Sequence, residues 1–110
     1  MPKRDSTLLI EDIKTAISRV EKYTAGFDRQ HFLADDKTVD AVVRNLEIIG
    51  EASRQLPDAF KESHSSIPWH KIAGLRNRIV HDYFGVDLEL IWQIIFIEIP
   101  SLKDNISVID

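Results

Sequence analysis

Side chains that can do chemistry are concentrated in one short stretch, residues 76–83, which reads Arg-Asn-Arg-Ile-Val-His-Asp-Tyr. The imidazole of His81, with an ordinary pKa of about 6.5, can accept and donate a proton near neutral pH. A guanidinium such as that of Arg76 can bind a phosphate through two parallel hydrogen bonds. The combination predicts a site that holds a phosphate and moves a proton. The simpler interpretation of His81 is a histidine near a helix C-terminus, stabilised by the helix dipole.

The position of Arg76 leaves two interpretations open. It falls on a side of the expected helix that also carries apolar residues, and an unpaired buried charge is costly. Arg76 therefore either pairs with a carboxylate of the preceding helix, such as Glu47 or Glu51, or binds an anion. We predict Asn77 and Glu51 as supporting residues of this site.

Helix geometry restricts how these residues act together. Arg76 and His81 are five residues apart and so about 140° apart on an ideal helix, whereas Asn77 and His81 are neighbours four residues apart. Tyr83 is nearly in line with Arg76. Joint action of Arg76 and His81 requires the arginine to reach around, the last helical turn to unwind toward Gly85, or a two-fold axis to join two subunits.

Other kinds of site have weaker support. The absence of cysteine excludes disulfides, thiolate zinc sites and a cysteine nucleophile. His64 and His70 have no further ligand at matching spacing, so we expect no metal site. No serine lies in a nucleophile elbow and the glycines form no phosphate-binding loop, and we expect no cofactor.

The composition indicates a folded protein with a single domain, residues 1–110. A net charge of −4 argues against a protein that coats nucleic acid, but it permits a small basic pocket for one phosphate. We see no signal peptide, and the longest apolar run is far too short to span a membrane. We therefore expect a cytoplasmic protein.

Helical periodicity predicts an all-α, four-helix up-and-down bundle that positions the chemical stretch. The helices are expected at residues 5–26, 35–57, 68–83 and 87–108, with a connector at residues 27–34 and a short helical turn at residues 57–62. The almost wholly apolar run at residues 90–99 also suits a buried strand, but a lone strand would have no partner. As a helix it must be covered on more than one face, which indicates a homodimer.

The pattern Arg76-Asn77-x3-His81-x-Tyr83 resembles the R-x4-H-x-Y motif of the HepT-like proteins, which belong to the HEPN superfamily. The likeness extends to residues 44–52, 69–77 and 86–100, so it covers most of the chain.

This resemblance implies a dimeric, metal-independent ribonuclease that acts as the toxin of a toxin–antitoxin pair. His81 would be the general acid or base at the RNA 2′-hydroxyl, Arg76 would hold the scissile phosphate, and Asn77 would orient it. The implied partner is an MntA-like nucleotidyltransferase antitoxin, which would silence the toxin by transferring AMP to Tyr83.

Two other functions remain open at this point. A non-catalytic helical module would bind the nucleotidyltransferase or its nucleotide substrate through Arg76 and His81. A purely structural bundle, with Arg76 paired to Glu51, would explain the fold but not the polar side of the third helix.

Overall fold

The computed structural model describes residues 4–81 and 85–109, with only the backbone of His81. The described chain forms the expected all-α, up-and-down four-helix bundle. No helix in these ranges combines the length and the apolar character needed to cross a membrane.

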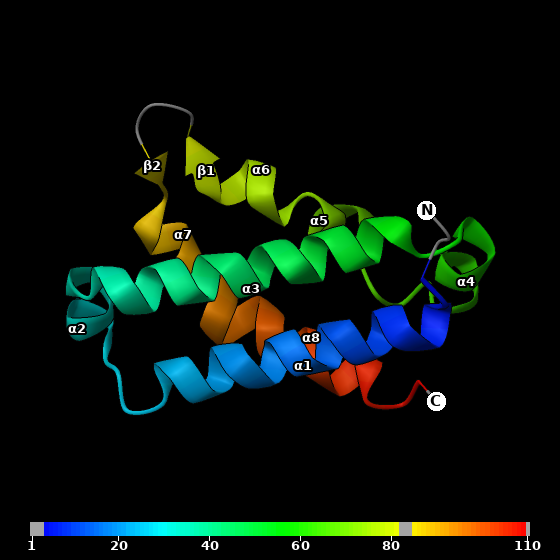
Figure 1. The fold of residues 1–110 in the computed structure, drawn as a ribbon, viewed down its shortest axis with the longest axis horizontal. Helices are drawn as coiled ribbons and strands as arrows, with labels where there is room; N and C mark the ends of the chain where they lie inside the picture. The colour runs from blue at the N-terminus through cyan, green and yellow to red at the C-terminus, as the bar shows by residue number, and fades with distance from the viewer. Residues whose placement is uncertain (1–3, 82–84, 110) are drawn as a thin grey trace.

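The two long helices, α1 (Ser6–Thr24) and α3 (Asp36–Gln55), lie antiparallel and in contact (Figure 1). Aspartates cap both helices: Asp5 accepts a hydrogen bond from the Thr7 amide at 2.7 Å, and Asp35 accepts one from the Thr38 amide at 3.0 Å. Their apolar stripes form much of the core, whose fully buried members include Leu9, Ile13, Val20, Val42, Leu46 and Ile49.

Two short helices join the long ones. The segment that we expected to be a connector contains α2 (Arg29–Ala34), so that prediction was wrong. A helix of six residues is too short to show a periodic apolar face, and Phe32 is its one fully buried residue. The helical turn predicted after Pro57 is present as α4 (Asp58–Ser63).

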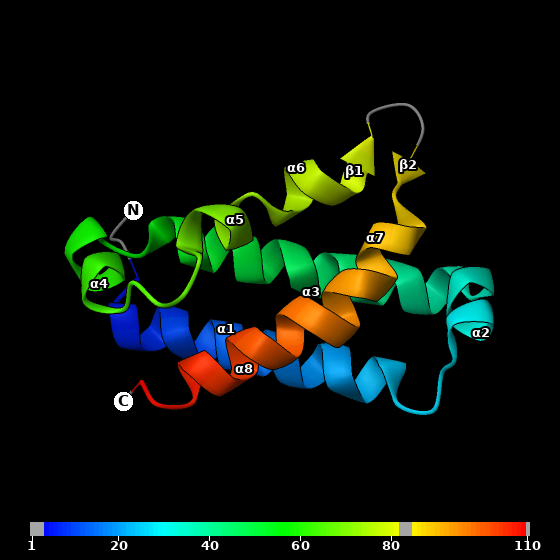
Figure 2. The ribbon, with the colours of Figure 1, turned by 180° about the vertical axis from the view of Figure 1, so that it is seen from behind.

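The apolar run near the C-terminus is helical throughout, as predicted. It contains α7 (Leu88–Gln93), the π-helical turn η2 (Ile94–Glu98) and α8 (Ile99–Ile106), and it crosses the back of α1 and α3 (Figure 2). Pro100 lacks an amide hydrogen, and its ring would collide with the carbonyl four residues earlier in an α-helix. The wider turn of η2, just before Pro100, keeps the helix continuous there.

Helices α5 (Trp69–Ala73) and α6 (Leu75–Ile79) pack along α3 on the side away from α1 (Figure 1). Gly50 of α3 permits this approach. A Cβ at Gly50 would lie 3.2 Å from the Ile72 carbonyl oxygen and 3.4 Å from that of Ala73. Gly50 therefore allows close packing of α5 on α3.

The third helix ends earlier than predicted, because α6 stops at Ile79. The strand β1 (Val80–His81) pairs antiparallel with β2 (Gly85–Val86), so the prediction of helix through residue 83 was wrong. Three features favour the hairpin: β-branched residues suit extended backbone, Gly85 has a φ of 81°, and Val80 and Val86 pack on the core.

Candidate functional site

Arg76 and Asn77 are exposed on α6 and face away from the core. The Nε atom of Arg76 lies 3.8 Å from Oε1 of Glu47 on α3, and 62% of the Arg76 side chain is exposed. This distance is too long for a direct hydrogen bond. Arg76 is thus steered by a carboxylate, as one interpretation predicted, while its guanidinium remains accessible to an anion.

Glu51 lies one helical turn beyond Glu47 and has different partners. Its Oε2 accepts a hydrogen bond from Nη1 of Arg54 at 2.7 Å, and its Oε1 accepts one from Gln55 at 3.4 Å. The ion pairs of the described residues join Arg76 to Glu47 and Glu51 to Arg54. The structural alternative in which Arg76 pairs with Glu51 is therefore wrong.

The hairpin changes the expected relation of His81 to the residues before it. The backbone leaves the helix at Val80, where ψ is 126°, and His81 pairs with Gly85 in the two-stranded ladder. Asn77 and His81 therefore do not form an i,i+4 pair on one helix. The backbone therefore unwinds before Gly85, as one of the three arrangements requires, and the arrangement with a two-fold axis stays a prediction.

The side chain of His81 and the whole of Tyr83 lie outside the described residues. The predicted acid–base role of His81 and the predicted AMP-acceptor role of Tyr83 therefore stay predictions.

Arg78, unlike Arg76 and Asn77, faces inward. Its Nη1 and Nη2 atoms each donate a hydrogen bond of 2.7 Å to the Glu98 carboxylate, and Lys71 lies 3.8 Å from the same carboxylate. The hydrogen bonds from Arg78 hold the pKa of Glu98 below its ordinary range, and those bonds also raise the pKa of Arg78. A glutamate inside an apolar run was the sequence signal for this pair.

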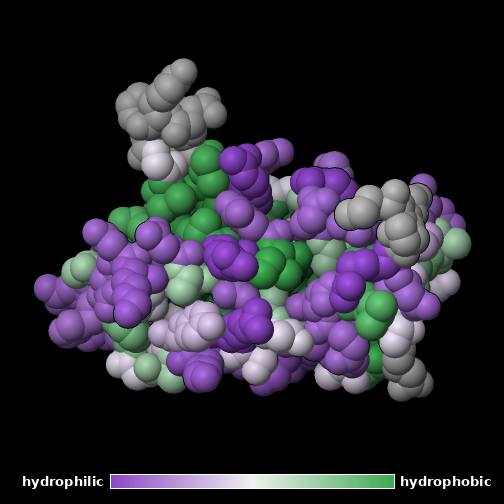
Figure 3. Space-filling model, in the orientation of Figure 1, coloured by the Kyte–Doolittle hydropathy of each residue, from purple (hydrophilic) through white to green (hydrophobic). Residues whose placement is uncertain are grey.

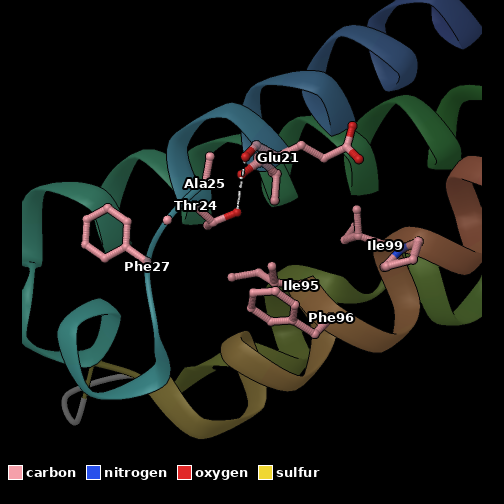
Figure 4. Close-up of a pocket in the computed structure, with 10 residues that line it drawn as sticks. Glu21, Thr24, Ala25, Phe27, Ile95, Phe96 and Ile99 are labelled. Atoms are coloured by element: carbon pink, nitrogen blue, oxygen red, sulfur yellow. Dashed lines mark hydrogen bonds between the residues drawn. The ribbon is translucent and has the colours of Figure 1, made fainter.

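An apolar hollow of about 290 Å³ lies between the end of α1 and η2 (Figure 4). Phe27, Ile95 and Phe96 line it, and the Thr24 hydroxyl donates to the Val20 carbonyl at 2.7 Å. The carboxylate of Glu21 points away from Ile95 and Phe96, and it accepts a hydrogen bond of 2.9 Å from Lys103. With its hydroxyl and its carboxylate already bonded, this hollow is poorly suited to proton transfer.

A second hollow, of about 620 Å³, is lined by basic residues and by Asn77 of the motif. Its other lining residues are Arg54, Lys61, Trp69, His70, Ala73 and Gly74. Sequence reasoning missed this hollow, because its residues come from four helices, α3 to α6, and only their packing brings Arg54 and Lys61 beside Asn77.

Comparisons with known proteins agree with the motif. The family described as Ribonuclease HepT-like matches residues 13–109. A probable ribonuclease HepT of Thermococcus cleftensis is 46% identical over 101 residues, which are 92% of this chain and 92% of the relative.

Two other relatives extend this likeness. A putative RNase of Caldanaerobacter subterraneus is 41% identical over 90% of this chain and 85% of its own length. A putative RNase of Methanocaldococcus jannaschii is 37% identical over 99% of this chain and its whole length. No solved structure matches the chain. Because the family match and these identities span most of its length, the chain belongs to the HepT-like ribonuclease family.

Proposed function

We propose that this protein is a metal-independent endoribonuclease and the toxin of a toxin–antitoxin pair. Arg76 and His81 would be its catalytic residues. The observation that carries the proposal is the exposed guanidinium of Arg76, loosely held by Glu47, on the helix that leads directly into His81. The family membership and the names of the relatives support the same reaction class.

The reaction needs a base, an acid and a cation, but no covalent enzyme intermediate. A base removes the proton of the RNA 2′-hydroxyl, and the 2′-oxygen forms a bond to the adjacent phosphorus. The bond between phosphorus and the 5′-oxygen breaks, and an acid gives a proton to that oxygen. His81 supplies the proton transfers, Arg76 stabilises the charge on the phosphate oxygens, and Asn77 orients them.

A homodimer would provide two such histidines around one cleft. In support, Phe96 and Ile97 are adjoining large apolar side chains on η2, 51% and 67% exposed, and exposed apolar patches often mark contact surfaces. Ile97 directly precedes Glu98, which is paired with Arg78 of α6, the helix that carries Arg76 and Asn77. A hydrophobic surface also lies beside the two strands, where Val80 and Val86 are half-buried (Figure 3). Apolar surface thus flanks the motif on two sides.

We infer that an MntA-like nucleotidyltransferase silences the toxin by transferring AMP to Tyr83. In that reaction the tyrosine oxygen would form a bond to the α-phosphorus of ATP, and pyrophosphate would leave. An attached AMP places a phosphate and a base two residues from His81, where they compete with RNA. A Tyr83→Phe variant should escape both modification and silencing, and silencing of that variant would contradict the role of Tyr83.

The first experiment is RNA cleavage in the presence of EDTA by the wild type and by His81→Ala, with analysis of the product ends. We expect cleavage that requires His81 and leaves 2′,3′-cyclic phosphates. Intact mass of the preparation shows whether Tyr83 already carries AMP. Unmodified, folded protein that leaves several RNAs intact would contradict the proposal and favour the non-catalytic binding module. Cellular RNA as substrate would place the protein in the cytoplasm.

A further inference from the structure

The basic hollow defined above lies between the C-terminal part of α3, the helix α4, and the pair α5 and α6. It shares Asn77 with the motif, so it is continuous with the surface that carries Arg76. All of its lining residues belong to the described part of the chain.

Basic side chains line this hollow, although the chain as a whole is acidic. The chain has 18 acidic and 14 basic residues, yet the lining contains Arg54, Lys61 and His70 and no carboxylate. Gathering cations at one place in an acidic protein creates a local attraction for anions. This asymmetry favours a ligand with at least one phosphate.

The guanidinium of Arg54 is fixed in place and keeps donors for such a ligand. Its Nη1 donates to Glu51 at 2.7 Å and its Nη2 donates to the Ala73 carbonyl at 3.0 Å, which leaves three of the five guanidinium N–H donors. The Lys61 ammonium makes a long contact of 3.5 Å with the Arg54 carbonyl oxygen, so it is close to Arg54 but weakly held. Glu51 therefore supports the hollow by orienting Arg54.

Two aromatic rings line the hollow, and the exposed one, His70, can stack with a base. Trp69 is almost buried, and its indole nitrogen donates to the His64 carbonyl at 3.1 Å, which fixes the ring. His70 is the next residue on α5 and its side chain is exposed. Cations beside an aromatic ring are the combination that binds single-stranded nucleic acid, through phosphate contacts and base stacking.

We propose that this hollow binds a nucleotide that flanks the cleaved bond, with its phosphate at Arg54 and Lys61. The substrate strand would then run from Arg76 and His81 past Asn77 into the hollow. This inference rests on the proposed ribonuclease function and adds a requirement for substrate length. A dinucleotide would fill the reaction site alone, whereas a longer single strand would also occupy the hollow.

The test compares Lys61→Ala with Lys103→Ala, which removes the same charge from an exposed site on α8. We would measure binding of an uncleavable 2′-O-methyl RNA octamer at several salt concentrations. Each lost phosphate contact should lower the slope of log Kd against log salt by about 0.7 and weaken binding several-fold at low salt. We expect this change for Lys61→Ala and wild-type behaviour for Lys103→Ala.

Cleavage assays separate this inference from the function on which it rests. Lys61→Ala should cut a dinucleotide at the wild-type rate and should have a raised KM for the octamer. If the wild type cuts RNA and Lys61→Ala has the same KM for the octamer as the wild type, the proposed nucleotide site in the hollow is wrong, while the proposed nuclease function stands. A wild-type chain that binds no octamer would overturn the proposed nucleotide site as well. Octamer binding that depends on Lys61 without any cleavage would uphold the hollow while contradicting the proposed nuclease.

Discussion

Arg78 and Glu98 form a doubly hydrogen-bonded ion pair, with both N–O distances at 2.7 Å, between the motif helix α6 and the π-helical turn η2. Only 25% and 24% of the two side chains are exposed. Within the sequence Arg76-Asn77-Arg78, the first two residues face solvent and the third faces the interior. The pair therefore fixes the rotation of α6 about its axis and so keeps Arg76 on the surface.

We expect Glu98→Gln to lower the free energy of unfolding by about 1–3 kcal/mol, because a half-buried guanidinium loses its charged partner. Glu21→Gln is the matched control, since it removes the exposed pair with Lys103 and should cost less than about 1 kcal/mol. Urea unfolding followed by circular dichroism measures both. Equal losses in the two variants would show that the Arg78–Glu98 pair stabilises the fold no more than an exposed ion pair does.

The same pair should make stability depend on pH in the acid range. In the folded protein Arg78 lowers the pKa of Glu98, whereas a glutamate in the unfolded chain has a pKa of about 4.3. In the acid range the unfolded chain therefore binds the proton first. The contribution of Glu98 is complete above the unfolded pKa and disappears as the pH falls through the lower folded pKa.

The measurement compares urea unfolding of wild type and Glu98→Gln from pH 7 to pH 3. The difference should be constant at neutral pH and shrink toward zero in acid. The pKa of Asp28 is also lowered, chiefly by the His31 backbone amide, but both proteins contain Asp28, so its contribution cancels. A difference that stays constant down to pH 3 would contradict the role given to Glu98.

Gly50→Ala should destabilise the fold by about 1 kcal/mol. Overpacking against the Ile72 and Ala73 carbonyls costs about 1–3 kcal/mol, and the higher helix propensity of alanine returns up to about 1 kcal/mol. Gly74→Ala is the control, because its Cβ would make an ordinary contact of 3.5 Å with the His70 carbonyl oxygen. Thermal unfolding of both should show a lower Tm for Gly50→Ala alone, and an unchanged Tm there would refute close packing of α5 on α3.

Ile97→Glu should weaken the proposed homodimer and reduce cleavage in parallel, because it puts a charge into apolar surface beside the motif. Val108→Glu makes the same kind of change at a residue that is 80% exposed near the C-terminus, and it should remain dimeric. Sedimentation velocity over a range of concentrations gives the association state. Full activity of an Ile97→Glu monomer would show that one subunit is sufficient.

Arg76→Ala should lower kcat/KM for RNA by about 10²–10³-fold, the usual loss when a group that stabilises transition-state charge is removed. Glu47→Gln should keep the activity close to that of the wild type, since Glu47 only steers Arg76 across 3.8 Å. Steady-state cleavage of one fluorescent RNA compares the two variants. A larger loss of kcat/KM for Glu47→Gln than for Arg76→Ala would show that the charge essential for cleavage is that of Glu47 and not that of Arg76.

The features that depend on neighbours along the chain were predictable from the sequence. The caps Asp5 and Asp35 and the apolar periodicity determined the long helices, because both signals act within a few turns of one helix. The chemical stretch around Arg76 was also visible, since its residue types and spacing need no tertiary information. Its resemblance to the HepT-like motif pointed to the family that the comparisons then showed.

Tertiary structure decided the features that depend on contacts between separate segments. Whether Val80–His81 and Gly85–Val86 form helix or paired strands depended on Val80 and Val86 packing on the core, since two-residue strands leave no periodic signal. The partner of Arg76 depended on how far α6 is shifted along α3, and that register brings it to Glu47 and not Glu51. Helical periodicity specifies which face is buried but not the position of one helix along another, and contacts such as that of Gly50 with the Ile72 and Ala73 carbonyls of α5 depend on the folded structure.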